Sequence, residues 1–356
     1  MNKPKSLIYR YAFTAIFLLG IVAQQAFARQ TEYTKYVDPF VGNADNGHTF
    51  PGACRPFGMI QTSPVTGGIG WRYCSEYVYS DSIIWGFTQD HLNGTGCMDL
   101  GDILVMPSTG KRTRSWDEYR SHFYKTQEFA TPGYYSVYLT DTKVKAELTA
   151  SAHVAFHRYT YDSTDSTSVL IDLQHGPAWN DKQYHSQVNR CETHWEDTYT
   201  LVGHVQNTVW VKQDYFFVIK FNRPVASHIT LNKAADTEKG DRIVATFEGI
   251  EQGEQLLMKI AMSTTSVDGA KKNLYTEVPN WDFAAVKQSA NNEWNTYLKR
   301  IDIEGTDDQK KNFYTSFYHA LIQPNQIADV DGMYRNAADK IVKAENGLFY
   351  STFSCW

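Results

Sequence analysis

The sequence has little cysteine and no excess of positive charge. Its five cysteines are scattered and none forms a C-x-x-C pair, which excludes a disulfide-rich scaffold and argues against structural zinc. A net charge of -5, with no cluster of lysine and arginine, excludes an electrostatic case for nucleic-acid binding. One disulfide in an oxidising compartment is an open alternative, although buried free cysteine is the simpler interpretation.

Two familiar catalytic signatures are also absent. The chain has no G-x-S-x-G elbow and no Gly-Lys-Ser/Thr loop that would cradle phosphate. These absences exclude the common esterase and nucleotide hydrolase chemistries. The composition, 14% aromatic and 21% charged, is that of a folded globular protein.

Long apolar runs are missing except near the N-terminus. A basic start precedes an apolar run from Ala12 to Ala23, and Ala26-Phe27-Ala28 fits the small-x-small cleavage rule of a signal peptide. The run is shorter than the roughly 20 residues that span a bilayer. We therefore expect residues 1–28 to be removed and the chain to be exported to the periplasm or outside the cell, without stable membrane insertion. An uncleaved anchor is the alternative.

Residues 134–263 predict strand after strand. Each candidate is short, rich in β-branched or aromatic residues, and bounded by Gly, Pro, Asp or Asn. The candidates are Tyr134–Leu139, Val144–Thr149, Val154–Tyr161, Val169–Leu173, Thr198–Val205, Val209–Phe221, Ile243–Phe247 and Gln255–Ser263. With no long helical period between them, they favour a mainly β fold, a large antiparallel β-sandwich.

The pattern becomes helical near Pro279. Apolar residues repeat at three- and four-residue steps from Phe283 to Ile301, and Asn280 or Asp282 could cap this helix. Thr306 is expected to cap a second helix that Pro324 ends. We expect a sandwich domain at 29–270, a helical linker at 271–305 and a further helical domain from 306.

The segment from Asp38 to Pro107 mixes glycines, aromatic rings and imidazoles. Glycine permits close backbone approach, and rings with polar tips suit a polyhydroxylated ligand. We therefore expect loops of this segment to line a ligand site. Asp99 and Asp102 are interpreted as braces of a turn rather than a catalytic pair, and Asp329-Val330-Asp331-Gly332 as a tight turn rather than a calcium loop.

Several motifs together resemble glycoside hydrolase family 92, the exported α-mannosidases. The resemblance covers nearly the whole chain after residue 28, with the motifs in the family's order. They are YVDPFVG at 36–42, GHTFPGA at 47–53, PFGM at 56–59, GFTQDHLNGTG at 86–96, DLGDILVMP at 99–107, FYTSFYHA at 313–320, DVDGMYR at 329–335 and FSCW at 353–356.

The resemblance implies an N-terminal sandwich, linker helices and an (α/α)6 barrel, with a mannoside bound between sandwich and barrel. It also implies a calcium-dependent, inverting, exo-acting enzyme that trims mannose from N-glycan-type oligosaccharides. In the family, both catalytic carboxylates and most calcium ligands come from the barrel. We therefore expect them beyond Trp356, the barrel to be truncated after its start, and this chain alone to be inactive. The missing barrel as a separate chain is one expected partner.

The expected sugar contacts are Trp71, Cys74, Glu76, His91 and Trp356. Trp71 follows a glycine run that could present its indole to a sugar face, or it could be a buried loop anchor. His91 could bind a mannose hydroxyl or merely fasten its turn. Glu76, and the Asp90 that precedes His91 where the family usually has an uncharged residue, could retune a subsite. The alternative function is a non-catalytic, lectin-like carbohydrate-binding sandwich; a weaker alternative is an assembly protein.

Overall fold

The computed structural model describes residues 32–110, 116–163, 165–176, 178–180, 183–185, 187–231 and 241–353. The predicted signal peptide, residues 1–28, lies outside the described residues. Residues from Thr34 onward belong to one compact unit, and the description below concerns that unit.

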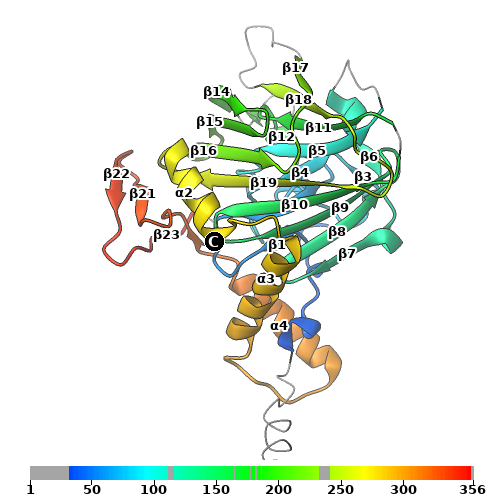
Figure 1. Cartoon of the computed structure of the whole chain (residues 1–356). Helices are drawn as coiled ribbons and strands as arrows, with labels where there is room; N and C mark the ends of the chain where they lie inside the picture. Colours follow the sequence, from blue (N-terminus) through cyan, green and yellow to red (C-terminus); the bar gives the residue numbers. More distant parts are fainter. Residues whose placement is uncertain are drawn as a thin grey trace, which may run out of the picture. The chain divides into compact units, whose positions relative to one another are not determined.

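Two large antiparallel sheets form the body of this unit (Figure 1). The seven-stranded sheet runs in the order β1 (Ala53–Cys54), β2 (Gln61–Val65), β4 (Gly86–Thr88), β5 (Leu104–Thr109), β11 (Thr167–Asp172), β18 (Arg242–Phe247) and β17 (Ser227–Leu231). The eight-stranded sheet runs in the order β14 (Gln187–Asp197), β15 (Thr200–Thr208), β16 (Lys212–Phe221), β19 (Gln255–Ser263), β10 (Val154–Tyr161), β9 (Val144–Ala150), β8 (Tyr134–Leu139) and β7 (Glu128–Thr131). The predicted antiparallel sandwich is confirmed.

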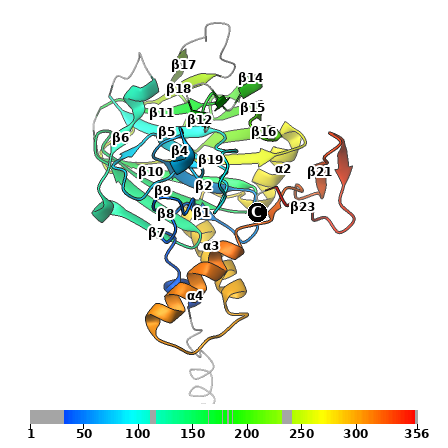
Figure 2. The ribbon, with the colours of Figure 1, turned by 180° about the vertical axis from the view of Figure 1, so that it is seen from behind.

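The main core lies between the two sheets. It joins residues such as Val105 and Ile171 of the seven-stranded sheet to Tyr135, Leu148 and Ile260 of the eight-stranded sheet. Seen from behind, β1, β2 and β4 stand in front of the eight-stranded sheet (Figure 2). The Asp38–Pro107 segment therefore supplies four strands of one sheet as well as loops.

Strand β10 shows how the sandwich is covered on both sides. Ala155 and Tyr159 point into the core between the sheets, whereas Val154 and Phe156 belong to a second apolar cluster on the outer face. Because successive side chains of a strand alternate between faces, the covered start of β10, Val154 to Phe156, is apolar on both faces.

Helix α2 (Val267–Glu277) covers that outer face, packing on β19, β16 and β10. Ser266 caps its N-terminus by accepting a hydrogen bond from the Gly269 amide at 3.0 Å. We expected a helical linker from residue 271 but identified no individual helix before Phe283, so α2 itself was not predicted. The reason is that the buried face of α2 includes Gly269 and Asn273, which give no apolar period.

Helices α3 (Phe283–Leu298) and α4 (Asp307–Ala320) follow at one end of the sandwich (Figure 1). Asp282 caps α3, and Thr306 with Gln309 forms a capping box on α4. Both predicted helices are therefore confirmed, and Asp282 rather than Asn280 is the cap. Whether the domain boundaries lie at residues 270 and 305 stays a prediction.

The remaining elements are short. Three small antiparallel pairs join β3 (Ile83–Ile84) to β6 (Ser121–His122), β20 (Asn325–Gln326) to β23 (Tyr350–Ser351), and β21 (Met333–Arg335) to β22 (Ile341–Lys343). A fourth joins β12 (Ala178–Asn180) to β13 (Gln183–His185). Four 3-10 turns are η1 (Tyr33–Tyr36), η2 (Trp71–Tyr73), η3 (Trp116–Tyr119) and η4 (Lys125–Gln127).

Candidate functional site

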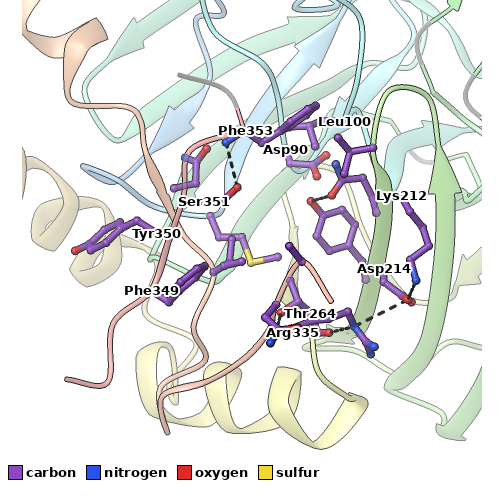
Figure 3. A pocket seen from close by; sticks show the side chains of 18 of the residues that line it. Asp90, Leu100, Lys212, Asp214, Thr264, Arg335, Phe349, Tyr350, Ser351 and Phe353 are labelled. Atoms are coloured by element: carbon purple, nitrogen blue, oxygen red, sulfur yellow. Dashed lines mark hydrogen bonds and ion pairs between the residues drawn. The ribbon is translucent and has the colours of Figure 1, made fainter. Parts of the chain in front are cut away.

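A groove of about 470 Å³ separates the sandwich from the last part of the described chain (Figure 3). The sandwich contributes Met59, Gln61, Asp90, Leu100 and residues 211–215 of the β15–β16 turn and β16. The opposite wall comes mainly from residues between Asn325 and Phe353. Apolar rings and charged groups line the same space, a mixture that suits a polar ligand with apolar faces.

Gln61 anchors the strand segment that carries Asp90. The Gln61 amide donates to the carbonyl of Gln89 at 2.8 Å, and the Gln61 carbonyl accepts from Nδ1 of His91 at 2.8 Å. The side-chain Oε1 of Gln61 also accepts the His91 amide at 2.9 Å. These three bonds bracket Asp90 on both sides, so Gln61 and Asp90 hold fixed positions on the groove wall.

Asp90 faces a second buried carboxyl, that of Asp102. The Asp102 amide donates to Oδ1 of Asp90 at 2.7 Å, and Asn207 donates to the Asp102 carboxyl. Burial raises the pKa of Asp90 to about 6, while burial and the charge of Asp90 raise the pKa of Asp102 well above its usual range. Two adjacent buried carboxylates cannot both ionise cheaply, so the pair favours a state that holds one proton.

Ion pairs connect the two walls at the rim of the groove. Lys212 of β16 lies 2.8 Å from Asp339, which also lies 3.0 Å from Arg335 of β21. Arg335 in turn lies 3.9 Å from Asp214 of β16 (Figure 3). The hydrogen bonds from Lys212 and Arg335 lower the pKa of Asp339. This alternation of charges ties the β21–β22 hairpin to the sandwich.

Trp71 lies in η2, outside the lining of this groove, with 43% of its surface exposed. Its Nε1 donates to Oδ1 of Asn46 at 2.9 Å, and its ring meets that of His48 edge-on at 4.8 Å. A Cβ at Gly96 would stand 2.3 Å from the indole, so only glycine allows the ring this position. The exposed ring leaves the predicted sugar contact open, and it stays a prediction.

Glu76 and His91 are buried behind the groove wall. Glu76 Oε1 accepts from Nε2 of His175 at 2.7 Å, and the hydroxyl of Thr88 lies 2.9 Å from both Glu76 Oε2 and His91 Nε2. Burial lowers the pKa of His91, against the opposing charge of Glu76. Both ring nitrogens of His91 bind protein groups, so in this structure His91 fastens its turn to Gln61. A direct sugar contact by Glu76 or His91 stays a prediction.

The last two predicted sugar contacts are Cys74 and Trp356. Cys74 is buried, and burial raises the pKa of its thiol to about 12, which keeps it neutral. It is a free thiol, as are Cys54, Cys97 and Cys191. Trp356 lies outside the described residues.

Two aspartates have the bracing roles that the sequence indicates. Asp99 Oδ2 accepts the amides of Trp210 and Val211 at 3.0 and 3.2 Å, which holds the β15–β16 turn. The Asp329 carboxyl accepts from Asn273 at 2.7 Å, while its carbonyl accepts the Gly332 amide at 2.7 Å and closes a tight turn. Neither residue lines the groove.

The sequence did not single out Gln61, Tyr215 or Arg335. Gln61 and Arg335 lie in or beside the family motifs but gave no signal of their own, and Tyr215 lies in an ordinary strand. Gln61 and Tyr215 come from distant strands of the sandwich, and Arg335 comes from the segment that forms the opposite wall of the groove. These residues meet only through the tertiary fold.

No cluster of three or more His, Cys, Asp or Glu side chains that could hold a metal occurs within the described ranges. The calcium dependence that the resemblance implies stays a prediction, and no step below depends on calcium. No helix among the described residues is long and apolar enough to cross a membrane.

Two family models match the chain. The glycosyl hydrolase family 92 N-terminal domain matches residues 36–263, and the glycosyl hydrolase family 92 catalytic domain matches residues 269–356. The groove thus lies between walls that come from both matched regions.

Solved structures and a curated protein are similar over most of the chain. A family GH92 alpha-mannosidase from Bacteroides thetaiotaomicron is 29% identical with a TM-score of 0.83, covering 90% of this chain and 45% of that chain. The same protein has been solved in complex with mannoimidazole. A GH92 inverting mannosidase from that organism, at 24% identity and TM-score 0.74, shares the fold. An uncharacterized secreted glycosidase of Arthroderma benhamiae is 23% identical over 91% of this chain and 46% of its own length. The chain therefore spans about half the length of these relatives.

Proposed function

Because the chain belongs to glycosyl hydrolase family 92, we propose that it is part of an exported, exo-acting α-mannosidase that removes terminal mannose from N-glycan-type oligosaccharides with inversion. The observation that carries this proposal is the groove between the region matched to the N-terminal domain and the region matched to the catalytic domain. The mannosidase relative at 29% identity, solved with mannoimidazole, supports mannose as the sugar. The secreted fungal glycosidase to which this chain is similar supports export.

In this proposal the described residues bind the sugar, and other residues carry out the hydrolysis. An inverting glycosidase needs one carboxyl that protonates the leaving oxygen and one carboxylate that activates water, about 6.5–9.5 Å apart. The carboxyls on this groove are otherwise engaged: Asp214 and Asp339 bind cationic side chains, and Asp90 lies against Asp102. We therefore assign the acid, the base and the expected calcium ligands to a longer polypeptide, and propose that residues 1–356 alone do not hydrolyse mannosides.

An activity assay with a binding assay tests this division. The purified chain is incubated with 4-nitrophenyl α-D-mannoside and calcium, with 4-nitrophenyl β-D-mannoside as the stereochemical control and a full-length GH92 mannosidase as the positive control. We expect no release of nitrophenol by the chain, but binding of methyl α-D-mannoside by saturation-transfer NMR. Release at the rate of the positive control contradicts the assignment of catalysis to other residues. Binding of neither mannoside nor any other hexoside contradicts the sugar-binding role.

A further inference from the structure

Two buried side-chain atoms of residues that line the groove have no protein hydrogen-bond partner in the described structure. They are Nε2 of Gln61, a donor, and Oδ2 of Asp90, an acceptor. Both residues line the groove, and their exposed fractions are only 1% and 2%. Buried polar groups in native proteins are nearly always paired, so a donor and an acceptor that both lack partners at one cavity indicate a missing polar ligand.

The positions of these two atoms are set by bonds at the other end of each side chain. Gln61 Oε1 is held by the His91 amide and Asp90 Oδ1 by the Asp102 amide, at 2.9 and 2.7 Å. A proton on Asp102 would occupy one lone pair of Asp90, but each carboxylate oxygen has two. The nearby hydroxyl of Tyr215, which also interacts with Asp90, donates to Gln213 Oε1 at 3.3 Å. Asp90 therefore keeps acceptor capacity for a further hydrogen bond.

Apolar groups surround this polar pair. Met59, Leu100 and Phe353 line the same groove, and Figure 3 places Phe353 and Leu100 beside Asp90. Phe353 also packs on the small cluster of Leu92, Cys97 and Leu100, which gives its ring a defined seat. A flat ring next to an oriented donor and acceptor matches a pyranose, which has C–H faces and hydroxyls that both donate and accept.

We propose that Gln61 and Asp90 form a clamp for sugar hydroxyls: Nε2 of Gln61 donates to a hydroxyl oxygen, and Asp90 accepts the proton of that hydroxyl or of its neighbour. The ligand is the terminal hexopyranose of an oligosaccharide. The choice of mannose rests on the proposed function, whereas the clamp itself needs neither calcium nor hydrolysis. The groove volume of about 470 Å³ lies within the range of about 300–1,000 Å³ typical of small-ligand sites.

Two near-isosteric variants test the clamp without removing the bonds that hold it. In Asp90→Asn, Oδ1 still accepts the Asp102 amide while a donor replaces the free acceptor. In Gln61→Glu, Oε1 still accepts the His91 amide while an acceptor replaces the free donor. Asp162→Asn, at an exposed carboxyl that bonds Tyr138 and Gln252, is the matched control. The probes are methyl α-D-mannoside and methyl α-D-galactoside, titrated into the full chain by NMR or calorimetry.

We expect the wild-type chain to bind methyl α-D-mannoside, each clamp variant to bind it at least 10-fold more weakly, and the control to bind it as the wild type does. Circular dichroism checks that each variant has the wild-type spectrum, and Gln61→Glu provides a second readout if Asp90→Asn fails to fold. Wild-type affinity in both clamp variants, or no hexoside bound by the wild type, overturns the proposal. Clamp-dependent binding of the galactoside but not the mannoside supports the clamp and contradicts the mannosidase function.

Discussion

The attachment of α3 to the sandwich depends strongly on Trp294. Its side chain is fully buried, its Nε1 donates to the carbonyl of Cys54 in β1 at 2.8 Å, and its ring lies 4.4 Å from that of Tyr318 in α4. One residue therefore connects the sandwich to both helices. Truncation to alanine should lower the free energy of unfolding by roughly 3–5 kcal/mol, because a large buried ring leaves a cavity.

The variant Trp294→Phe separates the ring from its hydrogen bond. It keeps most of the apolar packing but leaves the Cys54 carbonyl without its donor, an effect of about 1–3 kcal/mol. Urea unfolding followed by circular dichroism measures both losses. Tyr275→Ala is the control, because this α2 residue is 53% exposed and surface changes usually stay within about 0.5 kcal/mol. If Trp294→Ala lost less than about 1 kcal/mol, α3 would not be docked through this residue and the reasoning would be refuted.

Two further predictions concern single contacts. His153 is buried at 2.6 Å from Glu277; burial alone would lower the pKa of His153, but the hydrogen bond and charge of Glu277 raise it. This contribution is therefore complete below the unfolded histidine pKa of about 6.5 and is lost as pH rises through the folded value. The stability difference between wild type and His153→Gln in urea should shrink from pH 5.5 to pH 8.5, and a constant difference would contradict the pair. Gly101→Ala should lower the unfolding midpoint more than Gly253→Ala: both glycines have positive φ, worth about 1–2 kcal/mol, but only at Gly101 would a Cβ stand 2.6 Å from the Glu76 carboxylate. Equal losses in the two variants would show that Glu76 is not fixed there.

The strand pattern could be predicted where strands are apolar and clearly bounded. The predicted limits of β8, β10 and β19 agree with the structure residue for residue. Strand β14 was not predicted, because it lies at the edge of its sheet and is built largely from polar residues such as Asn189, Glu192 and Asp197. An edge strand with an uncovered face needs no apolar pattern, so its sequence resembles a loop.

Helix α2 was not predicted although it is buried. It is buried against the eight-stranded sheet, yet its contact face uses Gly269, Ala270 and Asn273 with a single leucine, Leu274. Asn273 there binds the Met262 carbonyl and the Asp329 carboxyl, at 3.0 and 2.7 Å. Polar bonds and small residues hold this helix close to the sheet, and neither produces the apolar period by which helices are predicted.

In the candidate site, too, some residues could be predicted from the sequence and others could not. Glycines and imidazoles in a tight turn stand out in a sequence, and they indicated His91, whereas the family resemblance indicated Glu76. In the structure these residues lie behind the wall: His91 binds Gln61 through its ring and through its amide, and Glu76 stands next to the same imidazole. Gln61, which reaches the groove, sits in a plain strand pattern, and Arg335 comes from a segment more than 200 residues away. A motif of this kind therefore marks the support of a binding surface more readily than the surface, because a support is built within one turn whereas a groove is closed only by tertiary packing.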